Sequence, residues 1–489
     1  MVHDADHPEI PEVKITAEQR EQLLADLLKA CSGDKTAVQV DDESLQEVAK
    51  DMSRHDAQVP IIAVFPNSIE EVAGCVKACR KVRVPMVPRG GGTGVEGGAV
   101  PSRGSVVIST ERLRKLELRK SELMAVVGAG IHKDELRKFL APHNLLFGPD
   151  PSSNPSVGGM AATGGSGMTT LRYGTTKENV VSLIVVTAKG DILQTRKEVR
   201  KSSSGYELNQ LFMGSEGTLG IICELTVRLK KIPSHRSGGL FPFNDVKSAV
   251  QTVVDAVQAD PPSLLRCELL NQEGVECTNA MFNTELPVKP TLFIELVGEE
   301  DSALRKDFDT LTKLAVGHGC PQGEVQFAEK GDQLDEVWEA RRGCYLAAMR
   351  VRKQKGGDRV FISDVCVPIP LLAEAVDESE RICHALGMKC IICAHIADGN
   401  FHCLVPHQLH ELPKVKEFEK KIIDHTLKIG GTVTGEHGVG TGKVMHSCRE
   451  HGPIHVAMQQ SIKKALDPEW LMNPGKVLPI PSASEMAKL

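Results

Sequence analysis

The chain of 489 residues is poor in aromatic side chains, carries little net charge and has no long apolar run. Aromatic residues make up 4% of it, which disfavours the base-stacking surfaces of proteins that bind single-stranded nucleic acids. A formal net charge of −6 offers no basic field to a phosphate backbone, so we expect no nucleic-acid partner. The longest apolar stretches, such as residues 180–188, are far shorter than the roughly 18 residues of a bilayer-spanning helix, so we expect no transmembrane segment.

The 14 cysteines follow no disulfide framework. The amino end has no apolar secretory core, so we expect most of the thiols to be reduced and buried. The one Cys-x-x-Cys pair, Cys390 and Cys393, lacks a second pair at zinc-finger spacing and lies in an apolar run that is typical of a strand. A disulfide-stabilised secreted protein and a zinc-finger module are therefore disfavoured.

The general composition is that of a globular protein with more than one domain. Apolar residues make up 41% and charged residues 25%, and the length exceeds that of one ordinary domain. Short strands and helices alternate along the sequence, which indicates α/β or α+β architecture. Examples are a predicted strand at residues 291–297, a helix at 301–317 and one helix at 334–352, and residues 233–239 fit a domain boundary. We divide the chain into an N-terminal helical segment (1–56), a first domain (57–233), a second domain (234–450) and a C-terminal helix and tail (451–489). In the second domain we expect a sheet that helices cover on one face.

A glycine-rich loop at residues 88–98 follows a predicted strand and contains the pattern G-x-G-x-x-G at Gly92, Gly94 and Gly97. The nicotinamide-binding Rossmann motif requires a helix directly after these glycines, whereas residues 99–104 lead into another predicted strand. We therefore interpret the loop as a turn whose backbone N–H groups surround a pyrophosphate without a helix dipole.

Two further glycine-rich segments follow, at residues 154–167 and 214–222. Val157, Met160 and Ala161 interleave with the glycines of the earlier segment, which fits poorly with a flexible linker. Glycines that close a backbone around a flat ring or a diphosphate, with Ser and Thr hydroxyls as added donors, would give this pattern. The later segment also fits an ordinary turn into a strand.

The segment from His395 to His402 has an Asp-Gly pair at its centre, which is a strong signal for a two-residue hairpin turn. With Asp398 and Gly399 at the turn, His395 lies directly opposite His402, with Cβ atoms about 4.5–5.5 Å apart on one face. Two imidazoles so placed can chelate one divalent ion. Two polar residues beside a turn are the alternative, and the spacing alone leaves both open.

A second segment, residues 434–440, places Glu436 and His437 together between glycines. Glu436 can complete a nitrogen–oxygen ligand set that suits zinc or manganese, and His437 can then act as a base. A solvated Glu-His pair in a loop is the alternative. The H-E-x-x-H motif of zinc hydrolases is absent, which disfavours that class of enzyme.

The three glycine loops, in this order, resemble the FAD-binding domain of the vanillyl-alcohol oxidase-type (PCMH-type) flavoproteins. In that family the first loop holds the pyrophosphate, and the other two line the flavin. Some members tether the flavin through a His in the first loop, where this chain has Gly and Thr, so the resemblance implies non-covalent FAD. It assigns cofactor contacts to these residues: Pro88, Arg89, Gly90, Gly91, Gly92, Thr93, Gly94, Pro149, Asp150, Gly158, Gly159, Ala162, Thr163, Ser166, Gly167, Tyr173, Glu216, Gly220, Ile222 and Asn473.

The two histidine-containing segments and the tail at residues 471–478 resemble the FAD-linked D-2-hydroxy-acid dehydrogenases, and most of all the D-lactate dehydrogenase (cytochrome) type. Residues 172–174, 290–293 and 363–368 add to that likeness. The resemblance implies an α+β fold with a two-part FAD-binding domain followed by a substrate (cap) domain, in which helices cover an antiparallel sheet. It also implies that the C-terminal tail returns to the FAD-binding domain.

The resemblance further implies that D-lactate, or a similar D-2-hydroxy monocarboxylate, is oxidised to the 2-keto acid by hydride transfer to flavin N5. It assigns the site to these residues: His395, His402 and Glu436 for the metal, His437 for the base, and Arg341, Asn400 and His437 for the substrate. Relatives that oxidise D-2-hydroxyglutarate place a lysine for its second carboxylate where this chain has residues 361–363, so a monocarboxylate is favoured.

Several alternatives stay open. They are a D-2-hydroxyglutarate or glycolate dehydrogenase of the same family, a peroxisomal alkyl-glycerone-phosphate synthase, and a flavin-binding protein without catalysis. The implied partner is an electron acceptor such as cytochrome c or another flavoprotein, and a homodimer also stays open.

The last three residues, Ala487, Lys488 and Leu489, are close to the Ser-Lys-Leu tripeptide that peroxisomal import receptors bind. We therefore expect a peroxisome or a related organelle. The mitochondrion is the alternative, because relatives of this type are usually mitochondrial.

Overall fold

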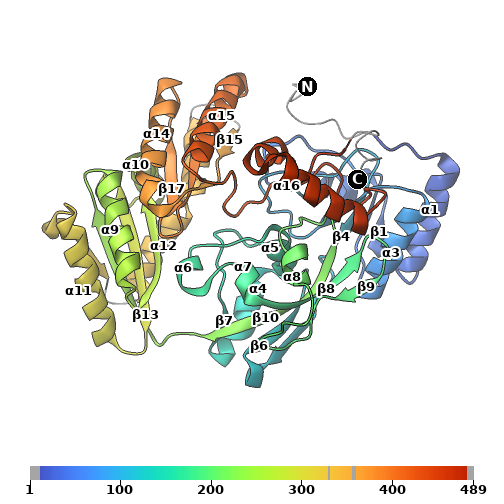
Figure 1. Ribbon diagram of the computed structural model, residues 1–489, viewed down its shortest axis with the longest axis horizontal. Coiled ribbons are helices and arrows are strands. Elements are labelled where there is room, and N and C mark those ends of the chain that lie inside the picture. The colour runs from blue at the N-terminus through green and yellow to red at the C-terminus, as the bar shows by residue number, and fades with distance from the viewer. Residues whose placement is uncertain (1–11, 329–330, 355–358, 482–489) are drawn as a thin grey trace. The chain divides into compact units, whose positions relative to one another are not determined.

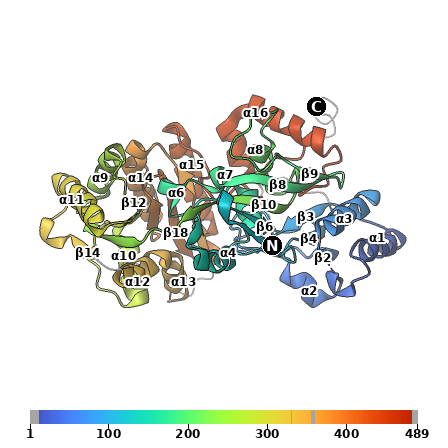
Figure 2. The same cartoon turned by 90° about the horizontal axis from the view of Figure 1, so that it is seen from below.

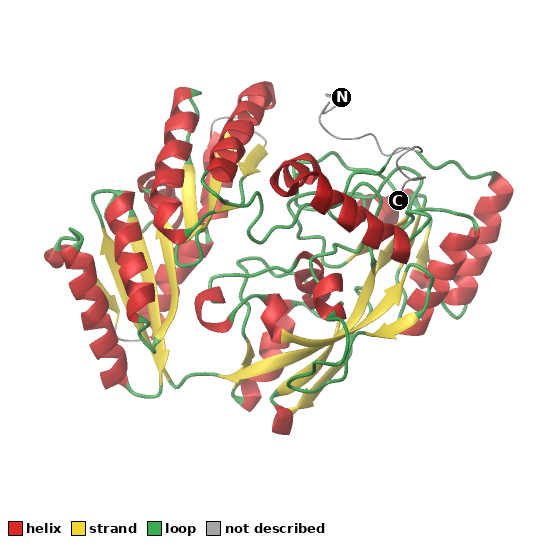
Figure 3. Cartoon of the chain, viewed as in Figure 1, coloured by secondary structure: helices red, strands yellow, loops and turns green. Residues whose placement is uncertain are grey.

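The computed structural model describes residues 12–328, 331–354 and 359–481, and the chain divides into two compact units. Unit 1 contains the described residues up to 166, residues 174–231 and the residues from 436 onward, and unit 2 contains residues 167–173 and 232–435. Figure 1 labels the elements of both units, and Figure 3 distinguishes helices from strands. The sequence-based boundary at residue 450 put Glu436 and His437 in the second domain, whereas the compact division puts them in unit 1.

Unit 1 contains a four-stranded sheet in the order β1-β2-β4-β3. Its strands are β1 (Val38–Gln39), β2 (Ile62–Val64), β3 (Met86–Arg89) and β4 (Val106–Ser109), and its helices are α1 (Ala17–Ala30), α2 (Asp42–Glu47) and α3 (Ile69–Lys81). α1 and α3 share a hydrophobic core with this sheet, so the N-terminal segment is part of unit 1. The first glycine loop joins β3 to β4 without a helix, which excludes the Rossmann interpretation.

The helix α3 shows how the sequence sets these elements. Ser68 Oγ accepts the N–H of Glu71 at 3.1 Å, which caps the first turn. Val72, Val76 and Cys79 recur at helical spacing and are fully buried.

The second sheet of unit 1 has the strand order β5-β6-β10-β8-β9, with β7 paired to β10. All of its pairs are antiparallel. The strands are β5 (Leu116–Arg119), β6 (Met124–Gly128), β7 (Leu145–Phe147), β8 (Val180–Thr187), β9 (Ile192–Gln194) and β10 (Gly220–Lys231), and the helices are α4 (Lys133–Leu140), α5 (Val157–Thr163), α7 (Thr176–Asn179), α8 (Leu208–Phe212) and α16 (Val444–Leu466). Two sheets in one unit confirm the predicted two-part organisation.

Unit 2 is built on one sheet in the order β14-β11-β13-β12-β17-β18-β15, with β16 paired to β18. Every pair is antiparallel, as the sequence predicted. The strands are β11 (His235–Pro242), β12 (Leu264–Leu270), β13 (Thr291–Gly298), β14 (Gln326–Ala328), β15 (Arg359–Ile362), β16 (Val365–Cys366), β17 (Ile391–His395) and β18 (Asn400–His407).

Helices cover this sheet on both faces, so the prediction of one covered face was wrong. α9 (Val246–Ala259), α11 (Asp301–Gly317), α14 (Leu372–Ala385) and α15 (Leu412–Lys428) share one hydrophobic cluster with it. A separate cluster on the other face contains residues of α10 (Gln272–Phe282), α12 (Gly331–Arg342) and α13 (Cys344–Gln354), and Met168 just before α6 (Thr170–Tyr173). Figure 2 shows the two helical layers with the sheet between them.

The helices on the second covered face also differ from the prediction, since α10 was not predicted. The stretch at residues 334–352 was predicted as one helix, whereas α12 ends and α13 begins on either side of Gly343. A Cβ on Gly343 would clash with the ring of Phe282 on α10, so a larger residue here would have to displace that ring. Residues 233–239, predicted as a domain boundary, lead into β11, whose Gly238 and Gly239 approach neighbouring backbone closely.

The C-terminal part of unit 1 is held by a buried lysine. α16 is kinked at Gly452, which has non-helical φ and ψ angles and precedes Pro453. Lys463 on this helix is 2% exposed, and its Nζ donates to Thr218 O at 2.6 Å and to Met472 O at 2.9 Å.

No helix in the described part of the chain combines the length and the apolarity that crossing a bilayer requires.

We predict that Lys463→Met destabilises unit 1 by about 3–5 kcal/mol, because it leaves the buried Asp467 carboxylate without its cation. Urea unfolding followed by circular dichroism measures the change. Lys138→Met, on the exposed face of α4, is the matched control. Equal unfolding midpoints for the two variants would contradict the prediction.

Candidate active site

The three glycine loops of unit 1 lie against one another. Ser156 Oγ accepts the N–H of Gly159 at 3.1 Å and the N–H of Gly91 at 3.3 Å, so one hydroxyl joins the second loop to the first. The N–H of Glu216 donates to Ala162 O at 2.8 Å and joins the third loop to the second. The structure therefore brings together the segments to which the sequence assigned FAD.

The glycines of the first loop permit this packing. A Cβ on Gly90 would clash with Ser156 Oγ, and one on Gly91 would lie 2.8 Å from His132 Cε1. Gly92 has a φ of +65°, which favours glycine. Contacts within the protein explain these three glycines, and their contact with a pyrophosphate stays a prediction.

Asn473 provides a buried polar atom that fits a bound cofactor. Its Nδ2 donates to Gly98 O at 3.0 Å and to Glu216 O at 2.8 Å, which fixes the orientation of the amide. Its Oδ1 is buried and has no hydrogen-bond partner among the residues that the structure describes. Such an acceptor costs about 1–3 kcal/mol when it stays unsatisfied. An N–H or O–H group of FAD would satisfy it, so the residues present fit this cofactor.

The other residues assigned to FAD divide between the units. All belong to unit 1 except Gly167 and Tyr173, which belong to unit 2. Two of them already have partners within unit 1, since Asp150 Oδ1 accepts from Lys133 Nζ at 3.1 Å and Ser166 Oγ donates to Glu436 Oε2 at 2.6 Å.

His395 and His402 lie on the hairpin of β17 and β18, but they are not directly opposed. The register pairs His395 with Asn400 and Cys393 with His402, so the predicted two-residue turn was wrong. The observed register differs from the predicted one by two residues, and side chains two residues apart on a strand point to the same face. Both histidines therefore still share one face of the sheet. Their ring centroids are 5.5 Å apart, which keeps both imidazoles available to one ion.

The hairpin has a four-residue loop because Gly399 follows the turn and does not form its centre. The N–H of Asp398 donates to His395 O at 2.9 Å, and Gly399 then has a φ of +78°. A turn followed by a glycine in the left-handed region is the common form of longer hairpin loops. A Cβ on Gly399 would also clash with Val367 O.

An acceptor in unit 2 holds the Nδ1 atom of each histidine. His395 Nδ1 lies 2.8 Å from Glu268 Oε1, and His402 Nδ1 lies 3.0 Å from the carbonyl oxygen of Ser363. A carbonyl oxygen can only accept, so His402 has its proton on Nδ1, and in the neutral ring the lone pair is on Nε2. Metal-binding histidines are typically oriented in this way.

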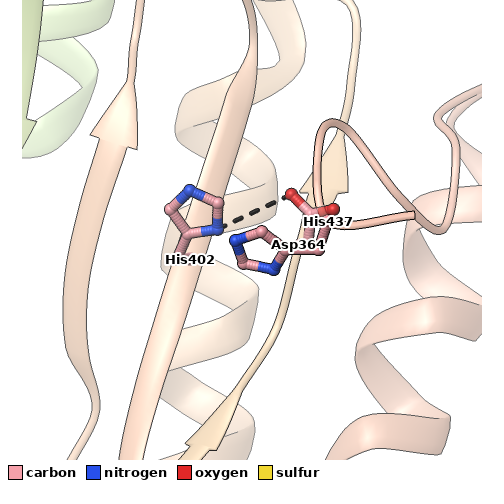
Figure 4. Close-up of side chains that lie close together, drawn as sticks. All are labelled: Asp364, His402 and His437. Carbon is pink, nitrogen blue, oxygen red and sulfur yellow. Dashed lines mark ion pairs between the residues drawn. The ribbon is translucent and has the colours of Figure 1, made fainter. Parts of the chain in front are cut away.

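Asp364 anchors the segment that leads to Glu436. It is 1% exposed and accepts hydrogen bonds from Asn400 Nδ2 at 3.0 Å, Thr434 Oγ1 at 2.6 Å and the N–H of Gly435 at 2.9 Å. Its Oδ1 also lies 3.6 Å from His402 Nδ1, and Figure 4 draws this ion pair together with His437. One carboxylate therefore orients a histidine and fixes the backbone just before Glu436.

Glu268 joins His395 to Arg341. One carboxylate oxygen accepts from His395 Nδ1, and the other accepts from Arg341 Nη2. Burial works to lower the pKa of Arg341, but Glu268 and the neighbouring thiols raise it by more, so the guanidinium stays charged. The Nε of Arg341 is buried and has no hydrogen-bond partner in the described part of the chain. Its predicted role, binding a substrate carboxylate, therefore has a donor available.

Asn400 has a similar buried atom. Its Nδ2 donates to Asp364 and to the carbonyl oxygen of Val365, whereas its Oδ1 is buried without a partner among the described residues. An O–H group of a substrate would satisfy this acceptor.

Glu436 and His437 belong to unit 1. Ser166 Oγ donates to Glu436 Oε2, and His437 Nε2 lies 4.0 Å from Glu436 Oε1. The two residues directly follow Gly435, whose N–H is bound by Asp364. Within unit 1, the hydrogen bond from Ser166 restrains the side chain of Glu436.

Sequence reasoning missed Glu268, and it recognised Asp364 only as part of a family segment. A signal for Glu268 was present, because it interrupts the apolar run of β12, and charged residues are almost never buried without a partner. The contribution of Ser363 is a backbone carbonyl, which no sequence pattern reveals.

Comparison with known proteins relates the chain to flavoenzymes. The family model described as the C-terminal domain of FAD-linked oxidases matches residues 232–477, and the FAD binding domain model matches residues 60–196.

Several relatives match over most of the chain. The probable mitochondrial D-lactate dehydrogenase of Danio rerio is 35% identical over 92% of this chain and 90% of its own length. The mitochondrial D-lactate dehydrogenase (cytochrome) of Arabidopsis thaliana is 34% identical over 96% and 82%. The glycolate oxidase subunit GlcD of Bacillus subtilis is 30% identical over 86% and 89%.

Solved structures support the fold. A 4-ethylphenol oxidase from Gulosibacter chungangensis superposes with a TM-score of 0.78 at 17% identity, covering 97% of this chain and 99% of that one. An alkyldihydroxyacetonephosphate synthase gives 0.73 at 19% identity, with 95% and 87% coverage. Because the family models and the relatives together extend over most of the sequence, the chain belongs to the family of FAD-linked oxidases, in which its relatives include D-lactate dehydrogenases.

Proposed function

We propose that this flavoenzyme oxidises a D-2-hydroxy monocarboxylate, such as D-lactate, to the corresponding 2-keto acid with the help of a divalent metal ion. The observation that carries the proposal is the pair His395 and His402, whose Nδ1 atoms are both held by acceptors so that the Nε2 atoms are the ligating nitrogens. The D-lactate dehydrogenases among the relatives support the choice of substrate.

His395 and His402 would hold the ion together with the Glu436 carboxylate, a nitrogen–oxygen set that suits zinc or manganese. The Cα atom of Glu436 is about 3.8 Å from that of Gly435, whose N–H is bound to Asp364, the carboxylate that also faces His402. Glu436 is therefore separated by one peptide bond from a residue that is bound to the carboxylate beside His402, which supports Glu436 as the third ligand. A bound divalent ion would lower the pKa of the substrate hydroxyl.

His437 takes the hydroxyl proton as general base, and Arg341 Nε donates to the substrate carboxylate. Asn400 Oδ1 accepts from the hydroxyl group before its proton is transferred. FAD, held without a covalent bond by the glycine loops, would supply the oxidising chemistry by taking up the hydride from C2. The products are a 2-keto acid, reduced flavin and a proton on His437.

The region near the substrate favours one carboxylate over two. Residues 361–363 contain Phe361, which is buried, and Ser363, whose Oγ accepts the N–H of Cys403 at 2.8 Å. No cationic side chain is present in those three residues to pair with a second carboxylate. D-2-hydroxyglutarate is therefore the less favoured substrate, and glycolate, the smallest 2-hydroxy monocarboxylate, is the second candidate because of the GlcD relative.

The electron acceptor and the compartment also belong to this proposal. The printed name of the Arabidopsis relative favours a cytochrome as acceptor, and the names of both D-lactate dehydrogenases favour the mitochondrion over the peroxisome. The tripeptide at residues 487–489, which suggested a peroxisome, lies outside the described residues.

Anaerobic titration of the purified holoenzyme tests the substrate. We expect D-lactate to bleach the oxidised flavin spectrum, and we expect L-lactate and D-2-hydroxyglutarate to do so at least about tenfold less efficiently, since a misplaced or unpaired charge costs more than 1.4 kcal/mol. Bleaching by glycolate alone would move the assignment to the second candidate. An unchanged spectrum with every 2-hydroxy acid would refute the proposal.

We predict that His437→Ala retains FAD and lowers kcat about 10²–10⁴-fold, because the general base is gone. The flavin absorbance of the purified variant and its steady-state turnover measure the two effects. His451→Ala, which removes an exposed histidine from α16, is the control and should leave turnover unchanged. Near-normal turnover of His437→Ala would remove this residue from the mechanism.

We also predict that a strong chelator abolishes turnover and that zinc or manganese restores it. Metal analysis of the untreated enzyme should give about one ion per chain, and His395→Ala should lower that content because it removes one of three protein ligands. Full turnover in a demonstrably metal-free preparation would show that the histidine pair has another purpose.

A further inference from the structure

Glu216 occupies an unusual place in the third glycine loop. Its backbone has a φ of +51°, which non-glycine residues rarely adopt, and its side chain is 8% exposed. The N–H of Glu216 donates to Ala162 O, and its carbonyl oxygen accepts from Asn473 Nδ2. The backbone of this residue is therefore fixed from two directions within unit 1.

The side chain of Glu216 binds the loop that carries Glu436 and His437. Its Oε1 accepts the N–H of Val439 at 2.7 Å, and its Oε2 accepts the N–H of Gly440 at 2.9 Å. Both carboxylate oxygens are thus used by successive backbone N–H groups, beginning two residues after His437. Hydrogen bonds to an ionised carboxylate are about twice as strong as neutral ones.

The surrounding glycines make room for this carboxylate. A Cβ on Gly98 would lie 3.0 Å from Glu216 Oε2, and one on Gly438 would lie 2.7 Å from Oε1. Gly438 has a φ of +82°, so the turn directly after His437 needs a glycine. The loop is also bound beyond Glu216, since Gly440 O accepts the N–H of Val477 at 3.0 Å.

We propose that Glu216 is a positioning residue that fixes the backbone at residues 438–440 and thereby sets the placement of Glu436 and His437. This inference rests on the proposed function, because it assigns to those two residues the metal and the proton. The predicted contact of Glu216 with FAD stays a prediction, and its carboxylate binds the protein loop. That carboxylate acts through the backbone and does not touch the reacting atoms.

A carboxylate is required because two N–H donors need two acceptors. A glutamine has one acceptor oxygen and an NH₂ group, which would face one of the two backbone N–H groups as a second donor. Burial raises the pKa of Glu216 to about 7, while the N–H groups of Val439 and Gly440 and the charges of Lys476 and Lys443 oppose the increase. These donors and cations offset only part of the effect of burial on the pKa, and the ionised form is the one that offers two acceptors to the loop.

Hydrogen exchange and steady-state kinetics of the FAD-loaded Glu216→Gln variant test the proposal. We expect the amides of residues 438–440 to exchange at least about tenfold faster, because a buried charge-assisted hydrogen bond is lost. We expect kcat for D-lactate to fall about 10²-fold from misplacement of the catalytic loop, with bound FAD retained. Glu224→Gln, on β10 of the same unit, is the matched control and should change none of these.

Glu216→Asp keeps the charge on a shorter side chain and should recover part of both the exchange protection and kcat, which also covers the case in which the glutamine variant does not fold. Unchanged exchange at residues 438–440 in either variant would overturn the proposal, and so would a loss of FAD with unchanged exchange. The proposed function is tested by a different variant. Normal turnover of His437→Ala would exclude His437 as the base, whereas hydrogen exchange at residues 438–440 would still show whether Glu216 holds the loop.

Discussion

Two buried carboxylates hold one short segment of the chain, and the arrangement of the site depends on them. Asp364 accepts the N–H of Gly435 in unit 2, and Glu216 accepts the N–H groups of Val439 and Gly440 in unit 1. Glu436 and His437 lie between these anchors in the sequence. Charge-assisted hydrogen bonds in buried surroundings are strong and directional, so they can fix a loop that contains no regular secondary structure.

The same principle orients the histidines. Glu268 and the Ser363 carbonyl determine which ring nitrogen of His395 and His402 has the proton, while the sheet supplies their common face. Polar atoms of Arg341, Asn400 and Asn473 are buried without partners among the described residues. Protein interiors rarely leave such atoms unsatisfied, and all three belong to residues that the sequence had assigned to ligands. These three atoms are therefore available to a cofactor or a substrate.

The sequence predicted the parts of this structure that depend on local pattern. Strands and helices with clear periodicity, such as β13 and α11, were placed almost to the residue. The hairpin of His395 and His402 was recognised, but its register was wrong because Asp-Gly suits both two-residue and longer loops. The antiparallel sheet was expected from the family resemblance, whereas its second helical layer, which contains α10 and the two helices divided at Gly343, was not expected.

What the sequence could not provide were contacts between distant residues. Nothing near position 216 reveals that its carboxylate binds the backbone at 439 and 440, since that contact depends on a close approach of segments more than 200 residues apart. The backbone carbonyl that orients His402 is equally invisible in a side-chain pattern. Local motifs identify the candidate residues, and long-range hydrogen bonds decide their orientation.

The central claim is that one divalent ion is bound by both His395 and His402. Pulsed electron paramagnetic resonance of the manganese-loaded holoenzyme tests it most directly, because couplings to imidazole nitrogens count the histidine ligands. The account predicts two nitrogen couplings in the native chain and one in each of His395→Ala and His402→Ala. A manganese signal without nitrogen coupling, or one that both substitutions leave unchanged, would contradict it.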